Sequence, residues 1–203
     1  VLVAPTRESG MEALIQCHGM GALSPNLVLL GFSEDPDRME RFVRVVRSTT
    51  ELGRSVALIR EDAHERDPWR PAPGPIDVWW RGQDNGHLMV LLAHMLAQND
   101  AWRGRRIRLL RVVGAEAGRE EARKHLKELL TVARVTADVR VLVDDHPVAL
   151  IRRTSNHAAV TFLGFLPPAE GEEVAFAEGT RRFLDGLGTV VMVWSTGEVR
   201  LEA

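Results

Sequence analysis

The sequence predicts an α/β fold, a layered and mostly parallel sheet covered by helices, with antiparallel strands added at its C-terminal edge. Short runs of β-branched and apolar residues alternate with stretches of helical period along the whole chain, and this alternation is typical of a parallel sheet. Of the 203 residues, 45% are hydrophobic and 27% are charged, which is the composition of a folded globular domain. The length fits one large domain or two small ones.

The first predicted α/β unit covers residues 1–75. Its short apolar runs predict strands at residues 1–5, 27–31 and 55–59. Thr6 is suited to cap a helix after the first strand, and we expect that helix to end near Gly19 and Gly21. A second helix, which Gly53 should close, is predicted by four apolar residues at helical spacing, Met39, Phe42, Val43 and Val46.

This unit ends in a charged, proline-rich loop, residues 61–75. The loop holds four prolines, Pro68, Pro71, Pro73 and Pro75. Proline lacks a backbone N–H, so neither a helix nor a sheet ladder is expected there. We therefore place the boundary between the two units at residue 75.

The second predicted unit covers residues 76–203. Apolar runs predict strands at residues 76–80, 107–113, 139–143, 159–163 and 190–194. Helical stripes predict a helix that begins after residue 86 and two more at residues 119–134 and 172–187, whereas the pattern of residues 144–158 supports no prediction. Residues 198–201 are expected to pair with the last strand as a hairpin, through a turn at Thr196 and Gly197.

Charge and cysteine content exclude several classes of protein. The chain has 26 basic and 28 acidic residues, a net charge of -2, so no nucleic-acid partner is expected. The single cysteine, Cys17, cannot form an internal disulfide, which indicates either a reducing compartment or simple disuse of cysteine. No run of about 20 apolar residues predicts a membrane span. No signal peptide is visible, and a start without methionine suggests a fragment.

The sequence contains no recognised catalytic motif. A nucleophile elbow, a P-loop, an H-E-x-x-H helix and a C-x-x-C pair are all missing. The seven histidines do not pair at the spacing that a zinc site requires, and the turn Asp144, Asp145 and His146 is expected only to be solvated. We therefore predict neither catalysis nor a bound metal.

One turn is a candidate ligand site. The strand at residues 76–80 leads into Asp84, Asn85 and Gly86 at the start of a helix, a position where free N–H groups bind anions in open α/β sheets. The alternative is that these residues only form a tight turn. Packing is favoured, because the turn holds no basic or hydroxyl side chain beyond Arg81.

A basic cluster precedes and enters the predicted strand at residues 107–113. It consists of Trp102, Arg103, Arg105, Arg106, Arg108 and Arg111. Arginine beside tryptophan is suited to phosphate or lipid headgroups. A solvated rim balanced by Glu116, Glu120 and Glu121 explains the cluster without a ligand, and the neutral overall charge favours this interpretation.

Several motifs in order resemble the C-terminal cytosolic domain of the cation-chloride cotransporters, the Na-K-Cl and K-Cl carrier family. Residues 19–32, GMGALSPNLVLLGF, are similar to the family's G-x-G-x-L-x-P-N-T-V-L-L-G-aromatic segment. The V-W-W, leucine-rich helix, W-x-x-x-x-I-R and L-G-x-x-x-P motifs also have counterparts. The residues that carry the resemblance are Pro25, Asn26, Gly31, Asp77, Trp79, Trp80, Gly86, Trp102 and Gly164.

The chain departs from the family pattern in places. The loop after Trp80 is about one residue longer, His87 stands where relatives have a second glycine, and Ala93 stands where many have proline. Relatives also carry a further α/β unit before the equivalent of Val1.

The resemblance implies a fold similar to universal stress protein domains and a function without catalysis. It implies a cytosolic regulatory and dimerisation domain of a chloride-coupled sodium or potassium symporter, on the cytoplasmic side of the membrane. The expected partners are a second copy and the membrane transport domain of the same polypeptide. The alternative is a nucleotide-binding module of the universal stress type, with Asp84, Asn85 and Gly86 as candidate contacts.

Overall fold

The computed structural model describes residues 3–17, 25–32, 35–62 and 71–201. Within them, seven strands form one sheet in the order β1-β2-β7-β6-β3-β4-β5. The strands are β1 (Leu27–Gly31), β2 (Ser55–Arg60), β3 (Ile76–Trp79), β4 (Ile107–Val113), β5 (Asp138–Val143), β6 (Val160–Gly164) and β7 (Val190–Trp194). The predicted α/β class is confirmed.

Only one pair of neighbouring strands is antiparallel. β2 and β7 run in opposite directions, whereas every other neighbouring pair is parallel. The carboxyl ends of β3 to β7 therefore lie at one edge of the sheet, and those of β1 and β2 at the other. The chain leaves β3 for β4 and β5 on one side and later returns to β6 on its other side, so β3 and β6 flank the topological switch point.

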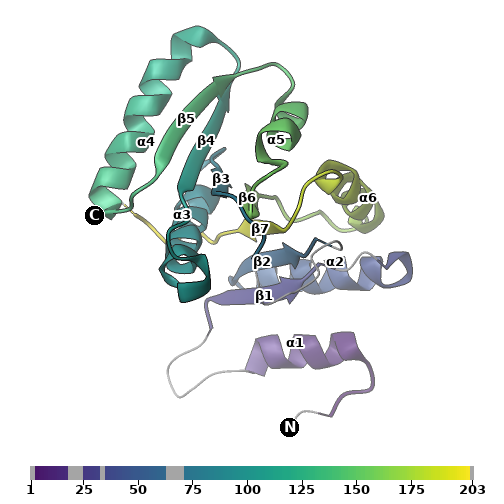
Figure 1. Ribbon diagram of the computed structural model, residues 1–203. Coiled ribbons are helices and arrows are strands. Elements are labelled where there is room, and N and C mark those ends of the chain that lie inside the picture. Colours follow the sequence, from purple (N-terminus) through teal and green to yellow (C-terminus); the bar gives the residue numbers. More distant parts are fainter. Residues whose placement is uncertain (1–2, 18–24, 33–34, 63–70, 202–203) are drawn as a thin grey trace.

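Helices cover both faces of the sheet (Figure 1). α3 and α4 pack on one face, whereas α2, α5 and α6 pack on the other, and α1 lies against α2. The helices are α1 (Arg7–Cys17), α2 (Pro36–Glu51), α3 (Gln83–Gln98), α4 (Arg119–Ala133), α5 (Pro147–Ser155) and α6 (Glu173–Leu184), with 3-10 turns η1 (Asp100–Trp102) and η2 (Glu116–Gly118).

Alternation along the strands supplies two apolar cores. Ile76 and Val78 face α3 and α4, and Trp79, the residue after Val78, faces the opposite helices. Both sides are buried, because Ile76 and Val78 are 0% exposed and Trp79 is 4% exposed. Near-continuous apolar strands of this kind are typical of a sheet covered on both faces.

Many predicted elements are confirmed. The strands at residues 27–31, 107–113 and 190–194 have the predicted bounds. The Ser9 backbone N–H donates to Thr6 Oγ1 at 3.1 Å, so Thr6 is the helix cap. The predicted helix end at Gly19 and Gly21 lies outside the described residues. The boundary at residue 75 stays a prediction, although strands from both sides of it share one sheet.

The predicted antiparallel hairpin at the C-terminal edge is wrong. β7 lies inside the sheet between β2 and β6, so both of its backbone edges are already paired and residues 198–201 have no place beside it. These residues instead cross α3. The Leu201 backbone N–H donates to His87 Nδ1 at 3.2 Å, and Arg200 lies 3.5 Å from the carboxylate of Asp84.

Three further sequence expectations need correction. Val3, Ala4 and Pro5 form no strand, while residues 1–2 lie outside the described part of the chain. Asp84, Asn85 and Gly86 belong to the first turn of α3 instead of a preceding loop. The unassigned residues 144–158 contain α5, which begins at Pro147, a residue whose fixed φ suits the first helical position.

Gly74 joins the end of the proline-rich loop to the start of β3. Its φ is +128°, and a Cβ atom there would lie 2.1 Å from the backbone oxygen of His157. Arg105 holds the same segment by donating to the carbonyl oxygens of Pro71 and Gly74, each at 3.0 Å. Only glycine fits this position.

We predict that Gly74→Ala destabilises the fold by about 2–3 kcal/mol, because the new methyl group clashes with backbone and the φ is strained. Urea unfolding followed by circular dichroism measures this. The matched control is Gly179→Ala on α6, where a Cβ meets nothing within 4 Å, and it should be neutral or slightly stabilising. Equal unfolding midpoints for the two variants would contradict the prediction.

Candidate functional site

A buried ion pair lies where the motif residues of β3 meet β4. Asp77 is 0% exposed and stands directly opposite Arg108 in the strand register. Arg108 donates from Nε to Asp77 Oδ1 at 2.6 Å and from Nη2 to Oδ2 at 2.5 Å. This two-pronged arrangement is the strongest form of charge-assisted hydrogen bond.

Helix α5 completes this ion pair at its C-terminal end. The Ser155 hydroxyl donates to Asp77 Oδ2 at 2.6 Å and accepts from the Trp79 indole N–H at 3.0 Å. Arg108 also donates to the backbone oxygen of Thr154 at 3.1 Å. The network thereby joins β3, β4 and α5, and it leaves Asp77 with three bonds from side chains. Its geometry is that of a structural anchor.

Asn85 holds together the loops at the carboxyl ends of β6 and β7. Its side-chain amide donates to the Phe165 oxygen at 3.0 Å, and its Oδ1 accepts from the Ser195 N–H at 2.8 Å. Gly164 leaves room for this side chain, because a Cβ there would lie 3.1 Å from Asn85 Nδ2. Asn85 and Gly164 therefore serve one contact, which joins the start of α3 to the ends of β6 and β7.

Gly86 allows α3 to approach the sheet. A Cβ atom at this position would lie 2.5 Å from the ring of Trp80. The Trp80 ring also meets His87 edge to face, with ring centres 5.4 Å apart. His87, which departs from the family pattern, is thus built into the core and also binds the C-terminal segment through Leu201.

Two of the three candidate ligand residues, Asp84 and Asn85, line a cavity of about 520 Å³ at the carboxyl ends of β3, β6 and β7. Trp194 also lines this cavity, whereas Gly86 is not among its lining residues. Their observed contacts favour packing, since the Asn85 amide bonds to backbone groups at both its nitrogen and its oxygen and the Asp84 carboxylate would repel a phosphate. Ligand binding by Asp84, Asn85 and Gly86 stays a prediction.

The remaining motif residues organise the two ends of the sheet. The Asn26 oxygen accepts from the Ser55 N–H at 2.9 Å and begins the β1–β2 ladder, and Pro25 accepts a bond from Arg54. Gly31 ends β1. Trp102 is half-buried against the α3–α4 core, with the Arg105 guanidinium 5.1 Å from its ring centre.

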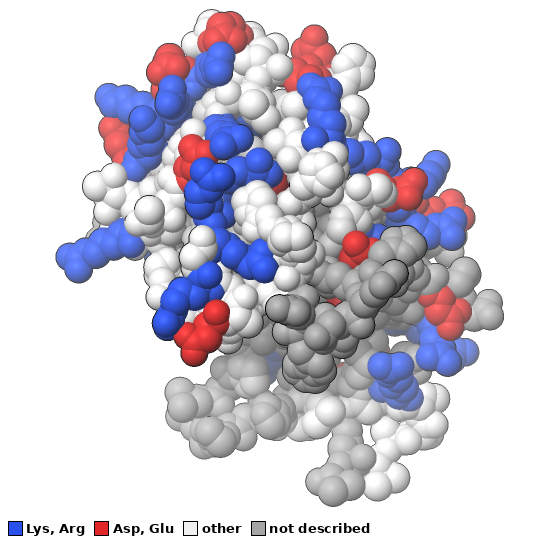
Figure 2. Space-filling view, in the orientation of Figure 1, with Lys and Arg blue, Asp and Glu red and all other residues white. Residues whose placement is uncertain are grey.

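Basic side chains gather over β4 and β5 on the face shown in Figure 2. Three of the acids that pair with them are not the glutamates that the sequence suggested. Arg103 pairs with Asp100 at 2.7 Å, Arg140 pairs with Asp138 at 2.8 Å, and Arg108 is the partner of buried Asp77. Within the predicted cluster, Arg103 and Arg108 are thus paired with aspartates and not with the predicted glutamates, whereas Arg106 and Arg111 have no ion pair with a described residue. The choice between a solvated rim and a ligand site stays a prediction.

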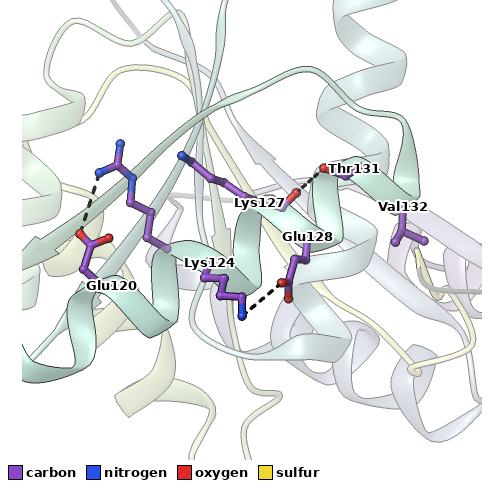
Figure 3. Close-up of a pocket in the computed structure, with 7 residues that line it drawn as sticks. Glu120, Lys124, Lys127, Glu128, Thr131 and Val132 are labelled. Carbon is purple, nitrogen blue, oxygen red and sulfur yellow. Dashed lines mark hydrogen bonds and ion pairs between the residues drawn. The ribbon is translucent and has the colours of Figure 1, made fainter.

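The outer surface of α4 carries a shallow hollow, shown in Figure 3. Its charges pair along the helix, from Arg123 to Glu120 and from Lys124 to Glu128, each at 3.9 Å. Such exposed pairs contribute only about 0.3–0.5 kcal/mol each. The side chains lie along one exposed helix and do not converge on a common point, which is the arrangement of a solvated helix face.

Two carboxylates near helix termini have lowered pKa values. The pKa of Asp144 is lowered mainly by the hydrogen bond from the His146 backbone N–H and then by Arg153. The pKa of Glu173 is lowered chiefly by its own backbone N–H at the start of α6, with a smaller contribution from Arg47. Both groups therefore stay ionised at neutral pH. Within the described residues no cluster of three metal-ligating side chains occurs.

Comparison with known proteins agrees with the motifs. Residues 70–160 match the family model "Solute carrier family 12". The crystal structure of the cytoplasmic domain of a prokaryotic cation chloride cotransporter has a similar fold, with a TM-score of 0.68 at 17% identity. The match covers 96% of this chain and 71% of that one. The resemblance to the cation-chloride cotransporters is confirmed. In the described part of the chain no helix is long and apolar enough to cross a membrane.

We predict that Asp77→Asn destabilises the fold by about 3 kcal/mol, because it leaves the Arg108 charge buried without its counter-ion. Urea unfolding is the measurement. Glu40→Ala, which removes an exposed pair with Arg44, is the control and should change stability by less than about 0.5 kcal/mol. A similar small loss for Asp77→Asn would show that the network is not an anchor.

Proposed function

We propose that this chain is a cytoplasmic regulatory and dimerisation module of a chloride-coupled cation symporter. The observation that carries the proposal is the family match at residues 70–160, together with the fold similarity that extends over 96% of the chain. In this proposal the module lies on the cytoplasmic side of the membrane. Its partners are the transport domain of the same polypeptide and a second copy of itself.

The module has no reaction centre of its own in this proposal. The most buried acidic side chain, Asp77, is bonded to Arg108 and Ser155, so it has no free oxygen aimed at an open cavity. An acid or base in catalysis needs reach to a substrate. The buried polar residues of the motif instead stiffen the sheet.

A stiff sheet is suited to transmit a contact from one surface to another. If the module makes different contacts in two states of the carrier, those contacts shift the population of the states by their difference in free energy. Regulation of this kind requires an interface with another protein surface and no catalytic reaction. We place this interface at β1, the edge strand whose outer side pairs with no other strand of the described chain.

The side chain of Leu29 supports this placement. Leu29 lies in the middle of β1 and is 62% exposed, although leucine is usually buried. An edge strand with exposed apolar side chains is a ready surface for a second chain. Natural proteins protect such an edge with charge, and β1, with the sequence LVLLG, carries none.

We predict that the chain is a dimer in solution and that Leu29→Lys weakens the dimer at least tenfold, because the interface must then bury a charge. Sedimentation equilibrium measures the dissociation constant. Val132→Lys is the matched control, since Val132 is 54% exposed on the charged face of α4 and should not affect assembly. A strict monomer at about 100 μM would remove the dimerisation proposal.

The alternative function is a nucleotide-binding module. The cavity of about 520 Å³ beside the first turn of α3 favours it, because ligands bind at this edge of open α/β sheets. Against it stand the acidic side chain of Asp84 and the Asn85 amide, which already bonds to the backbone at both its nitrogen and its oxygen.

We predict no heat of binding when ATP is added in calorimetry at physiological salt. The carboxylate of Asp84 at the N-terminus of α3 should repel the phosphates. Micromolar affinity that is altered by Asp84→Ala, but not by Glu120→Ala on α4, would instead support the nucleotide-binding function.

A further inference from the structure

A second cavity, of about 590 Å³, lies at the carboxyl ends of β3 and β4 beside α5. It has apolar walls from three elements of the fold. Trp79 from β3, Ile151 from α5 and Phe183 from α6 contribute to them. A cavity of this size with aromatic walls is typical of a site for a small organic molecule.

The same cavity carries two arginines without counter-ions. Arg81 follows β3 and Arg111 lies in β4, and neither has an ion-pair partner among the described residues. One acid, Asp144, also lines the cavity, but its oxygens are already taken by the His146 N–H at 2.6 Å and by Arg153. The local charge is therefore positive.

Trp80 also belongs to the lining of this cavity. It is 4% exposed, and its ring packs under α3 against Gly86 and His87. The charged groups of the lining that can hold an anion are therefore Arg81 and Arg111.

We propose that this cavity binds a small planar organic acid with a single negative charge. The aromatic walls hold the flat body, and the Arg81 and Arg111 guanidinium groups hold the acid group. The apolar walls and the volume of about 590 Å³ suit a small monoanion better than an extended polyphosphate. This site is independent of the proposed dimerisation and involves none of the candidate residues in the first turn of α3.

The first test uses anilinonaphthalene sulfonate, a flat aromatic monoanion whose fluorescence rises in an apolar site. We expect saturable binding by the folded chain, weakened about tenfold by Arg81→Gln and again by Arg111→Gln, since each removes a charge-assisted bond. Arg123→Gln, in the hollow on α4, is the matched control and should leave the affinity unchanged. Equal affinity for the Arg81→Gln/Arg111→Gln double variant and for Arg123→Gln would overturn the proposal.

The second test locates the probe. In a nitrogen-labelled sample the indole N–H resonance of Trp79, assigned with Trp79→Phe, should shift on titration, because the Trp79 ring forms a wall of the cavity, while that of Trp102 stays in place. Gly114→Leu should block the shift without unfolding the chain, because Gly114 lines the cavity and a Cβ there meets nothing within 4 Å. An unmoved Trp79 resonance at saturation, or unchanged binding by folded Gly114→Leu, would show that the probe binds elsewhere and would overturn the proposal.

Discussion

A carboxylate that is shut off from water must find its counter-charge inside the protein, and Asp77 finds it in Arg108 on the neighbouring strand. This requirement fixes the register of β3 against β4, because a slip by one residue would separate the pair. Ser155 and Thr154 then fix the end of α5 against the same two strands. The placement of β3, β4 and α5 relative to one another thus depends on one ion pair.

Most positions that resemble the cotransporter family serve packing. Gly86 lets α3 meet Trp80, and Gly164 makes room for the clamp that Asn85 forms between two loops. A motif of this kind identifies a fold more than a reaction. The function proposed above requires no more than this, because a module that acts by contact would have its specificity in surface residues such as Leu29, which is 62% exposed.

Strong local patterns made the fold class and many boundaries predictable from sequence. The four apolar residues of α2 and the β-branched run of β4 specify their elements without help from the rest of the chain. The position of β7 was not predictable, since its apolar run suits an interior strand and a hairpin equally. The Asp77–Arg108 pair was also out of reach, because 31 residues separate its members and only the strand register brings them together.

The place of β7 has a consequence for biosynthesis. This strand joins β2 to β6, so the sheet is two unconnected pieces until residues 190–194 leave the ribosome. Until then β2 and β6 each expose an open edge, and contacts between such distant segments form slowly. A nascent chain of this kind is most prone to aggregate before β7 has emerged, and termination ahead of β7 would release a protein whose two parts cannot join.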